Sequence, residues 1–212
     1  MRKRIIICIF LLVGGSILLA GGCGVTRHQP EPVTYYALHY TPPDPLPAGH
    51  NKTEKPLVIH VPRLHAQPPY NTTHMVYADS PYQRNKYAYH QWITTPADML
   101  TSLLLRDVEA SKIADAAVSM PAGKGVTHRI EGMIIDFFEN DENTQWEAVL
   151  VLRLTLTRMD PAAMTGKILF QSTYNEVRPL EKNNPHELAR SMSKAMEAVS
   201  RRFIADMNGK LP

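Results

Sequence analysis

The chain has 212 residues, of which 44% are hydrophobic, and this length and apolar content suit one globular domain with its own core. The formal net charge is only +3 and there are two cysteines, so neither a nucleic-acid-binding surface nor a disulfide scaffold is indicated.

The N-terminus has the pattern of a bacterial lipoprotein signal. Residues 2–4 are basic, residues 5–19 are mostly apolar, and the small residues 20–22 lead directly to Cys23. Small side chains let the backbone fit an extended protease cleft, and the thiol of the new N-terminal residue carries a diacylglycerol group. The apolar run is shorter than the roughly 20 residues of a membrane-spanning helix, which disfavours an uncleaved anchor. We therefore predict a signal peptide at 1–22 and lipidation of Cys23.

Cleavage before Cys23 changes the charge and the cysteine count. It removes three of the 23 basic residues and no acidic one, leaving 20 of each sign, and it removes Cys8. The mature chain would be neutral, so its net charge gives no reason to expect nucleic-acid binding. Its one thiol would be lipidated, which excludes disulfides and thiol catalysis. Gly24 follows the cysteine. Enteric sorting retains lipoproteins at the inner membrane through aspartate at this position. Because this chain has glycine there, we expect the protein at the periplasmic face of the outer membrane.

A proline-rich segment follows the predicted lipidation site. Residues 23–34 are predicted to be the lipidated cysteine and a flexible tether, and residues 35–208 are predicted to be the folded domain. Within the domain, residues 35–40 are expected to form a first strand, and residues 41–55 a loop.

Short apolar runs then alternate with turn residues. Strands are expected at 57–61, 75–77 and 86–92, where β-branched and aromatic residues concentrate. A helix is expected to begin after Thr95, because this N-cap is followed by Pro96 at the first helical position and by an acidic residue in the first turn.

Two long strands are predicted at 129–138 and 144–158, and a third at 167–177. In the second of them the even-numbered residues from 146 to 156 are apolar and most of the odd-numbered ones are polar, which is the period of a strand with one buried face. Asn184 is predicted to cap a closing amphipathic helix. The expected fold class is α+β, a mainly antiparallel sheet with two amphipathic helices packed on one side.

No catalytic or cofactor motif is present. The nine histidines do not form a closely spaced ligand pair, and the acidic run 139–142 lacks the glycine and the spacing of a calcium loop. Neither a phosphate-binding glycine loop nor a nucleophile motif occurs. We therefore predict no metal, no cofactor and no enzymatic activity.

Six aromatic residues lie between positions 70 and 92, interleaved with basic residues. Tyrosine, tryptophan and arginine are enriched at interfaces, but they also fill sheet cores. Tyr87, Tyr89 and Trp92 are expected in the core, whereas Tyr70 and Tyr82 lie next to proline turns and are the better contact candidates. Together with Arg63, these two tyrosines are the predicted partner-binding residues.

The order of several motifs resembles one known family. These motifs are Arg63, Pro68-Pro69-Tyr70, Met75-Val76-Tyr77, the tyrosine-rich stretch that ends at Trp92, Pro96, Met99-Leu100, the stretch from Arg129 to Phe137, and the final helix. Over about Tyr35 to Met207 the chain is similar to the ABC-type transport auxiliary lipoproteins, the paraquat-inducible protein C-like family. Asn71 departs from the pattern, because the family often has an apolar residue there.

The resemblance implies a non-enzymatic outer-membrane lipoprotein of an intermembrane lipid transport system. Its implied partners are an MCE-domain protein that bridges the periplasm and further copies of itself, since family members can form rings. Two alternatives stay open on the residues alone: a lipoprotein that regulates cell-wall synthesis, and a lipid-anchored hydrolase. A gene for an MCE protein beside this one would favour the first interpretation.

Overall fold

A computed structural model describes residues 31–47, 56–120, 125–142, 145–160 and 165–211. The predicted signal peptide, Cys23 and most of the predicted tether lie outside these residues. From Val33 onward the chain forms one compact unit. Its elements in chain order are β1 (Thr34–Tyr36), β2 (Val58–His60), β3 (His65–Ala66), the 3-10 turn η1 (Pro68–Tyr70), β4 (His74–Ala78), β5 (Asn85–Trp92), α2 (Pro96–Ser111), β6 (Ala116–Val118), β7 (His128–Asn140), β8 (Glu147–Asp160), β9 (Thr165–Pro179) and α3 (Pro185–Asn208).

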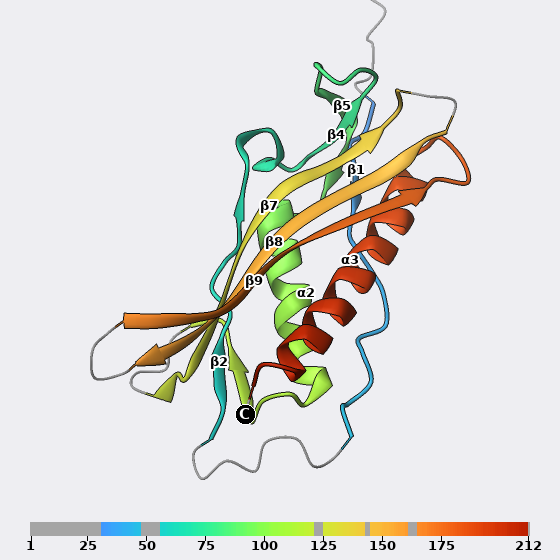
Figure 1. The fold of residues 1–212 in the computed structure, drawn as a ribbon. Coiled ribbons are helices and arrows are strands. Elements are labelled where there is room, and N and C mark those ends of the chain that lie inside the picture. The colour runs from blue at the N-terminus through green and yellow to red at the C-terminus, as the bar shows by residue number, and fades with distance from the viewer. Residues whose placement is uncertain (1–30, 48–55, 121–124, 143–144, 161–164, 212) are drawn as a thin grey trace, which may run out of the picture. The chain divides into compact units, whose positions relative to one another are not determined.

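The centre of the sheet is β7, which pairs along both of its edges (Figure 1). One edge runs antiparallel to β8, from His128 opposite Arg158 to Asn140 opposite Glu147. Three short strands share the other edge, and all three run parallel to β7: β2 near its start, β3 near its middle and β4 near its end. Beyond β8 lies β9, and beyond β4 lie β5 and then β1, while β6 pairs with β2.

The sheet is therefore mixed, and the prediction of a mainly antiparallel sheet is wrong. The pairs β4–β5, β7–β8 and β8–β9 are antiparallel, whereas β1–β5, β2–β6 and the three short strands against β7 are parallel. Parallel pairing needs a crossover connection, and α2 supplies one because it lies in the sequence between β2–β4 and β6–β7. The prediction of an α+β domain is confirmed.

Both helices begin at the predicted caps. The side chain of Thr95 accepts a hydrogen bond from the backbone N–H of Asp98, and that of Asn184 accepts one from Glu187. In each helix proline follows the cap. The two helices contact each other and lie on the same side of the curled sheet, where α3 packs against β8 and β9 (Figure 1).

The core lies between this helix layer and the sheet. The predicted inward face of β8 is confirmed, since Ala148, Leu150, Leu152, Leu154 and Leu156 are completely buried. They meet the buried side of α3, where the residues at helical spacing are Leu188, Met192, Met196, Val199 and Phe203.

At Gly132, β7 approaches its neighbours closely. A Cβ atom on Gly132 would lie 2.7 Å from a side-chain carbon of Leu154 and 2.8 Å from one of Leu64. Both distances are shorter than van der Waals contact, so a larger residue would force these two leucine side chains to move.

None of the helices in the described ranges is both long enough and apolar enough to span a membrane.

Candidate docking surface

Arg63 joins the segment between β2 and β3 to the N-terminus of α2 by hydrogen bonds. Its Nη2 donates to Asp98 Oδ2 at 3.2 Å and to Thr95 Oγ1 at 3.0 Å, and its Nε also contacts the Asp98 carboxylate. The Arg63 hydrogen bond, followed by that from Thr95, holds the pKa of Asp98 below its usual value. Half of the Arg63 side chain stays exposed, so the residue could also contact a partner.

Tyr70 lies inside the domain rather than on its surface. Its side chain is only 3% exposed, and its ring stacks on Phe138 with centroids 6.2 Å apart. The hydroxyl donates to Asp136 Oδ1 at 2.9 Å and accepts from Arg84 Nε at 3.1 Å. The expectation that a proline turn would expose this ring is wrong, because η1 folds it back onto β7.

Arg84 links this buried tyrosine to the hairpin that joins β4 and β5. Its guanidinium lies 4.2 Å from the centre of the Phe138 ring, and its Nη1 donates to the carbonyl oxygen of Gln83 at 2.9 Å. Tyr82, two residues away, is 99% exposed. Sequence reasoning noted Arg84 among the basic residues of this region but assigned it no role, since its partner Phe138 is distant in sequence.

An exposed apolar surface lies on β1, β5 and the residues that flank them. The pairing of Thr34 with His90 and of Tyr35 with Gln91 places four side chains on one face: Val33, Tyr35, Tyr89 and Ile93. All four are exposed, Tyr35 by 57% and Tyr89 by 43%. We call this set the β1–β5 face.

On the opposite side of the same two strands Trp92 is buried, while Tyr36 and His90 are partly buried. Trp92 is 2% exposed and packs edge-on against Phe137, as predicted for a core residue. Tyr87 is partly buried, whereas the prediction that Tyr89 lies in the core is wrong. Val33, Tyr35 and Ile93 were not singled out from the sequence, because only the register of β1 on β5 brings them beside Tyr89.

A buried carboxylate joins three elements near the same end of the sheet. Glu139 Oε2 accepts from the Tyr87 hydroxyl at 2.9 Å. With the Asn183 amide turned to satisfy both of its neighbours, that side chain donates to Glu139 Oε1 at 3.0 Å and accepts from the indole N–H of Trp146 at 2.8 Å. Glu139 is 1% exposed, and burial raises its pKa above the usual value.

We expect Glu139→Gln to change how stability depends on pH. A carboxyl whose pKa is raised on folding favours the folded state most at low pH, and this contribution is lost as the pH rises through the folded-state pKa. The free energy of unfolding of the variant, minus that of the wild type, should therefore increase from about pH 4 to pH 7. Urea titrations across this range measure it, with the exposed Glu131→Gln on the same strand as control. A difference that stays constant or falls with pH would contradict the assignment.

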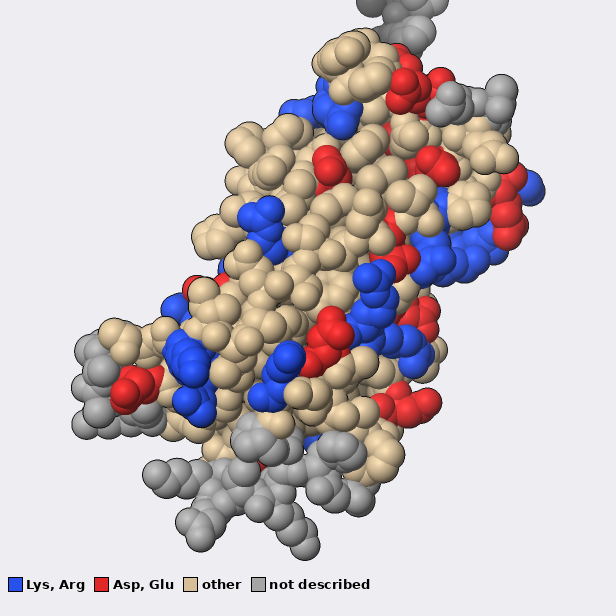
Figure 2. Space-filling view, in the orientation of Figure 1, with Lys and Arg blue, Asp and Glu red and all other residues tan. Residues whose placement is uncertain are grey.

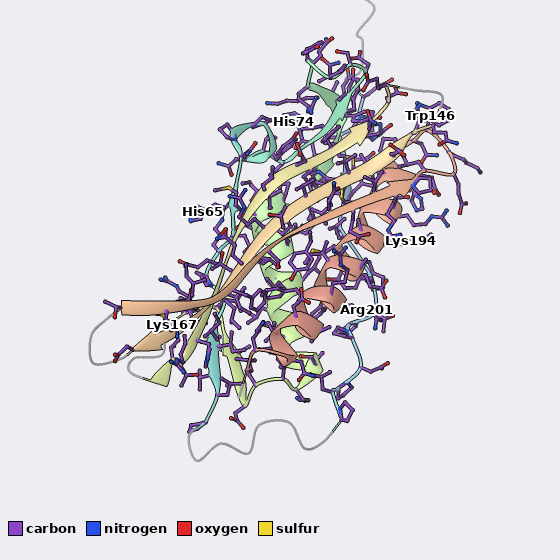
Figure 3. The ribbon with its side chains drawn as sticks, viewed as in Figure 1. His65, His74, Trp146, Lys167, Lys194 and Arg201 are labelled. Carbon is purple, nitrogen blue, oxygen red and sulfur yellow. The ribbon has the colours of Figure 1, made fainter. Side chains whose placement is uncertain are left out.

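The histidines do not gather into a ligand set within the described residues. Figure 3 shows His65 and His74 apart from each other, on β3 and β4. His74 Nδ1 lies 3.2 Å from the carbonyl oxygen of Tyr87, and His60 Nε2 lies 3.1 Å from that of Ser119. In the part of the chain that the structure describes, no three histidine, cysteine or acidic residues lie close enough to hold a metal ion.

Several charged residues on α3 and β9 form ion pairs with one another. Along α3 and β9, Arg178 and Arg202 both contact Glu176 at 2.6 Å, and Arg190 contacts Glu181 at 2.6 Å. Figure 2 accordingly shows basic and acidic groups side by side over this region, while much of the surface between them is uncharged. Because the charges on α3 and β9 offset one another, the apolar and aromatic β1–β5 face is the better candidate for docking.

Two open grooves lie at the other end of the long strands. One is lined by Arg158, Met159, Asp160, Thr165, Gly166 and Lys167, and the other shares Met159 and Gly166 with it. Figure 3 shows that Lys167, which lines the first groove, lies far from Trp146, which precedes the start of β8 at the opposite end of the long strands.

The sequence and the fold are both similar to known proteins. The sequence model of the family described as the ABC-type transport auxiliary lipoprotein component matches residues 36–204. The sequence matches no curated protein at a significant level.

Three solved structures show the same fold at low sequence identity. The DUF330-family protein XCC0632 of Xanthomonas campestris is 16% identical, with a TM-score of 0.69 over 83% of this chain and 96% of that one. An uncharacterised protein is 13% identical, with a TM-score of 0.65 over 84% and 99% of the two chains. The hypothetical protein CT253 of Chlamydia trachomatis is 10% identical, with a TM-score of 0.50 over 74% and 97%.

Proposed function

The chain belongs to the ABC-type transport auxiliary lipoprotein family, and from this premise we propose that it is a non-enzymatic component of an intermembrane lipid transport system. The observation that carries the proposal is the extent of the family match, since residues 36–204 run from the end of β1 almost to the end of α3. The whole folded domain, rather than one motif, thus has the family's pattern.

We propose that Cys23 carries the lipid anchor. The small residues before it and the basic and apolar segments further upstream support this site. Several acyl chains on one cysteine give lasting attachment, because each buried methylene contributes about 0.8 kcal/mol of membrane affinity. Gly24, in place of a retaining aspartate, supports export to the periplasmic face of the outer membrane.

We propose an MCE-domain protein as the partner and the β1–β5 face as its docking surface, with further copies of this chain completing a ring. The face joins two tyrosines to two aliphatic side chains, and tyrosine contributes large contact area with few torsions to freeze. Of the contact residues predicted from the sequence, Arg63 and Tyr82 both keep exposed side chains, and Arg63 remains a proposed contact of the protein partner. For Tyr70 we propose an indirect role, through its hydrogen bond with Arg84.

Co-purification with the MCE protein encoded beside this gene tests the proposal. Tyr35→Ala should weaken that association about 30-fold, corresponding to about 2 kcal/mol for an interface hot spot. Met120→Ala is the matched control, because Met120 is 79% exposed but lies on a different part of the domain. The docking surface would be wrong if both variants bound like the wild type. The proposed function would be wrong if the wild-type protein captured no MCE protein.

A further inference from the structure

The turn between β4 and β5 carries an exposed aromatic ring, that of Tyr82, two residues from Arg84, which is bonded to the rest of the domain. We call residues 79–84 the hairpin tip. Pro81, Tyr82 and Gln83 are exposed, while Arg84 is held by Tyr70, by the Phe138 ring and by the Gln83 carbonyl. A ring that projects from a fixed base loses little conformational entropy when it docks.

The register of β1 on β5 shows that the hairpin tip lies on the side of the domain from which the chain enters β1. Thr34 is level with His90, and β1 runs parallel to β5. Residues that precede Thr34 therefore approach from the side of Asn85, where the tip begins (Figure 1). Asn85 is five residues before His90, so the tip extends about 17 Å beyond the start of β1 at about 3.3 Å per strand residue.

The chain between Cys23 and Thr34 limits how far the domain can stand from the bilayer. This step rests on the proposed lipid anchor at Cys23. Eleven residues span at most about 37 Å when fully extended. With the tip about 17 Å ahead of β1 in that direction, at most about 20 Å separates the tip from the headgroups, and a less extended path brings them into contact.

The chemistry of the tip suits a lipid headgroup layer. Tyrosine is enriched at membrane interfaces, where its ring and its hydroxyl meet an apolar and a wet environment. Within residues 79–86 the exposed cations Arg84 and Lys86 outnumber the one acid, Asp79. A further acid, Asp141 after the end of β7, lies near the start of this stretch, because its backbone N–H donates to the Ala78 carbonyl oxygen at 2.7 Å. Exposed cations near a membrane surface are attracted to anionic lipids.

We propose that the hairpin tip docks on the bilayer surface, with Tyr82 at the level of the lipid headgroups. The domain then rests on the membrane at two points, the lipid on Cys23 and this ring. The β1–β5 face stands beside the tip and stays free for the protein partner.

The test uses the full-length native lipoprotein in vesicles of phosphatidylethanolamine and phosphatidylglycerol. Cys8 and Cys23 are the only cysteines, so after processing and lipidation an introduced cysteine is the single free thiol. Gln83→Cys places an environment-sensitive fluorophore beside the intact Tyr82, and Lys167→Cys places one at the far end of β9. We expect a lipid-borne quencher to act several-fold more strongly at position 83, and Tyr82→Ser in the Gln83→Cys protein to abolish the difference.

The outcomes separate this inference from the proposed function. Vesicle flotation with equal quenching at both positions would overturn the inference alone. Shielding of position 83 only after the MCE protein is added would also overturn it, in favour of a protein contact. If position 83 were shielded to the same extent in detergent without lipid, the inference would also be overturned, in favour of a contact with a second copy of the chain. An unmodified Cys23 by mass spectrometry, with no flotation, would overturn the proposed anchor and with it this inference.

Discussion

Asp107→Ala is expected to lower the free energy of unfolding by about 2–3 kcal/mol, because the Tyr40 hydroxyl would lose its acceptor while Arg106, which is 34% exposed, would keep access to water. Asp107 on α2 is completely buried. Its Oδ2 accepts from the Tyr40 hydroxyl at 2.6 Å, and its Oδ1 accepts from Arg106 Nε at 2.9 Å and Nη2 at 2.8 Å. Burial raises the pKa of Tyr40, so its hydroxyl keeps its proton and would lose its acceptor in the variant.

Urea denaturation of the variant and of Glu109→Ala measures this effect. Glu109 is an exposed acid on the same helix, and its removal should change stability by less than about 0.5 kcal/mol. Equal effects of the two substitutions would show that the buried network adds nothing to stability.

This network explains how the segment after β1 is held against the helices. Arg106 Nη1 donates to the carbonyl oxygen of Tyr40 at 3.2 Å, and its guanidinium lies 4.5 Å from the centre of the Tyr40 ring. Nearby, the backbone N–H of His39 donates to Ser193 Oγ at 3.0 Å. The segment that follows β1 is thus bonded to both α2 and α3.

Much of the fold could be predicted because its longer elements carry their own signals. Both helix starts depend on local caps, and β8 is long enough for its alternation to show which side is buried. The short strands β3 and β6, and the parallel pairing of the other short strands, could not be predicted in the same way. β3 has two residues and β6 has three, which are too few to show an alternating pattern. Their pairing depends on the crossover through α2 and not on the local sequence.

The candidate site was harder to predict because burial there depends on distant residues. Tyr70 and Tyr82 both lie beside proline, yet one is buried and the other exposed. The difference comes from Phe138 and Asp136 on β7, more than sixty residues further along the chain. The β1–β5 face likewise exists only through the pairing of two strands that are distant in sequence.

Tyr70→Ala is the second substitution expected to have a large effect, lowering the free energy of unfolding by about 3–5 kcal/mol. The change removes a buried ring from its stack on Phe138 and leaves a cavity between η1 and β7. It also removes the hydroxyl that joins Asp136 to Arg84. Tyr82→Ala, by contrast, should change stability by less than about 0.5 kcal/mol, because its ring is 99% exposed and packs against nothing that would be lost.

Tyr70→Phe separates the ring from the hydroxyl in the same experiment. It keeps the stacked ring but leaves Asp136 without this donor, so a loss of about 1–3 kcal/mol is expected, between the effects of the other two variants. Thermal and urea unfolding of all three proteins give this order directly. If Tyr70→Ala were as stable as Tyr82→Ala, Tyr70 would not be a core residue. Because Arg84 would also lose its hydrogen bond to the Tyr70 hydroxyl, amide exchange in the hairpin tip should be faster in Tyr70→Phe than in Tyr82→Ala.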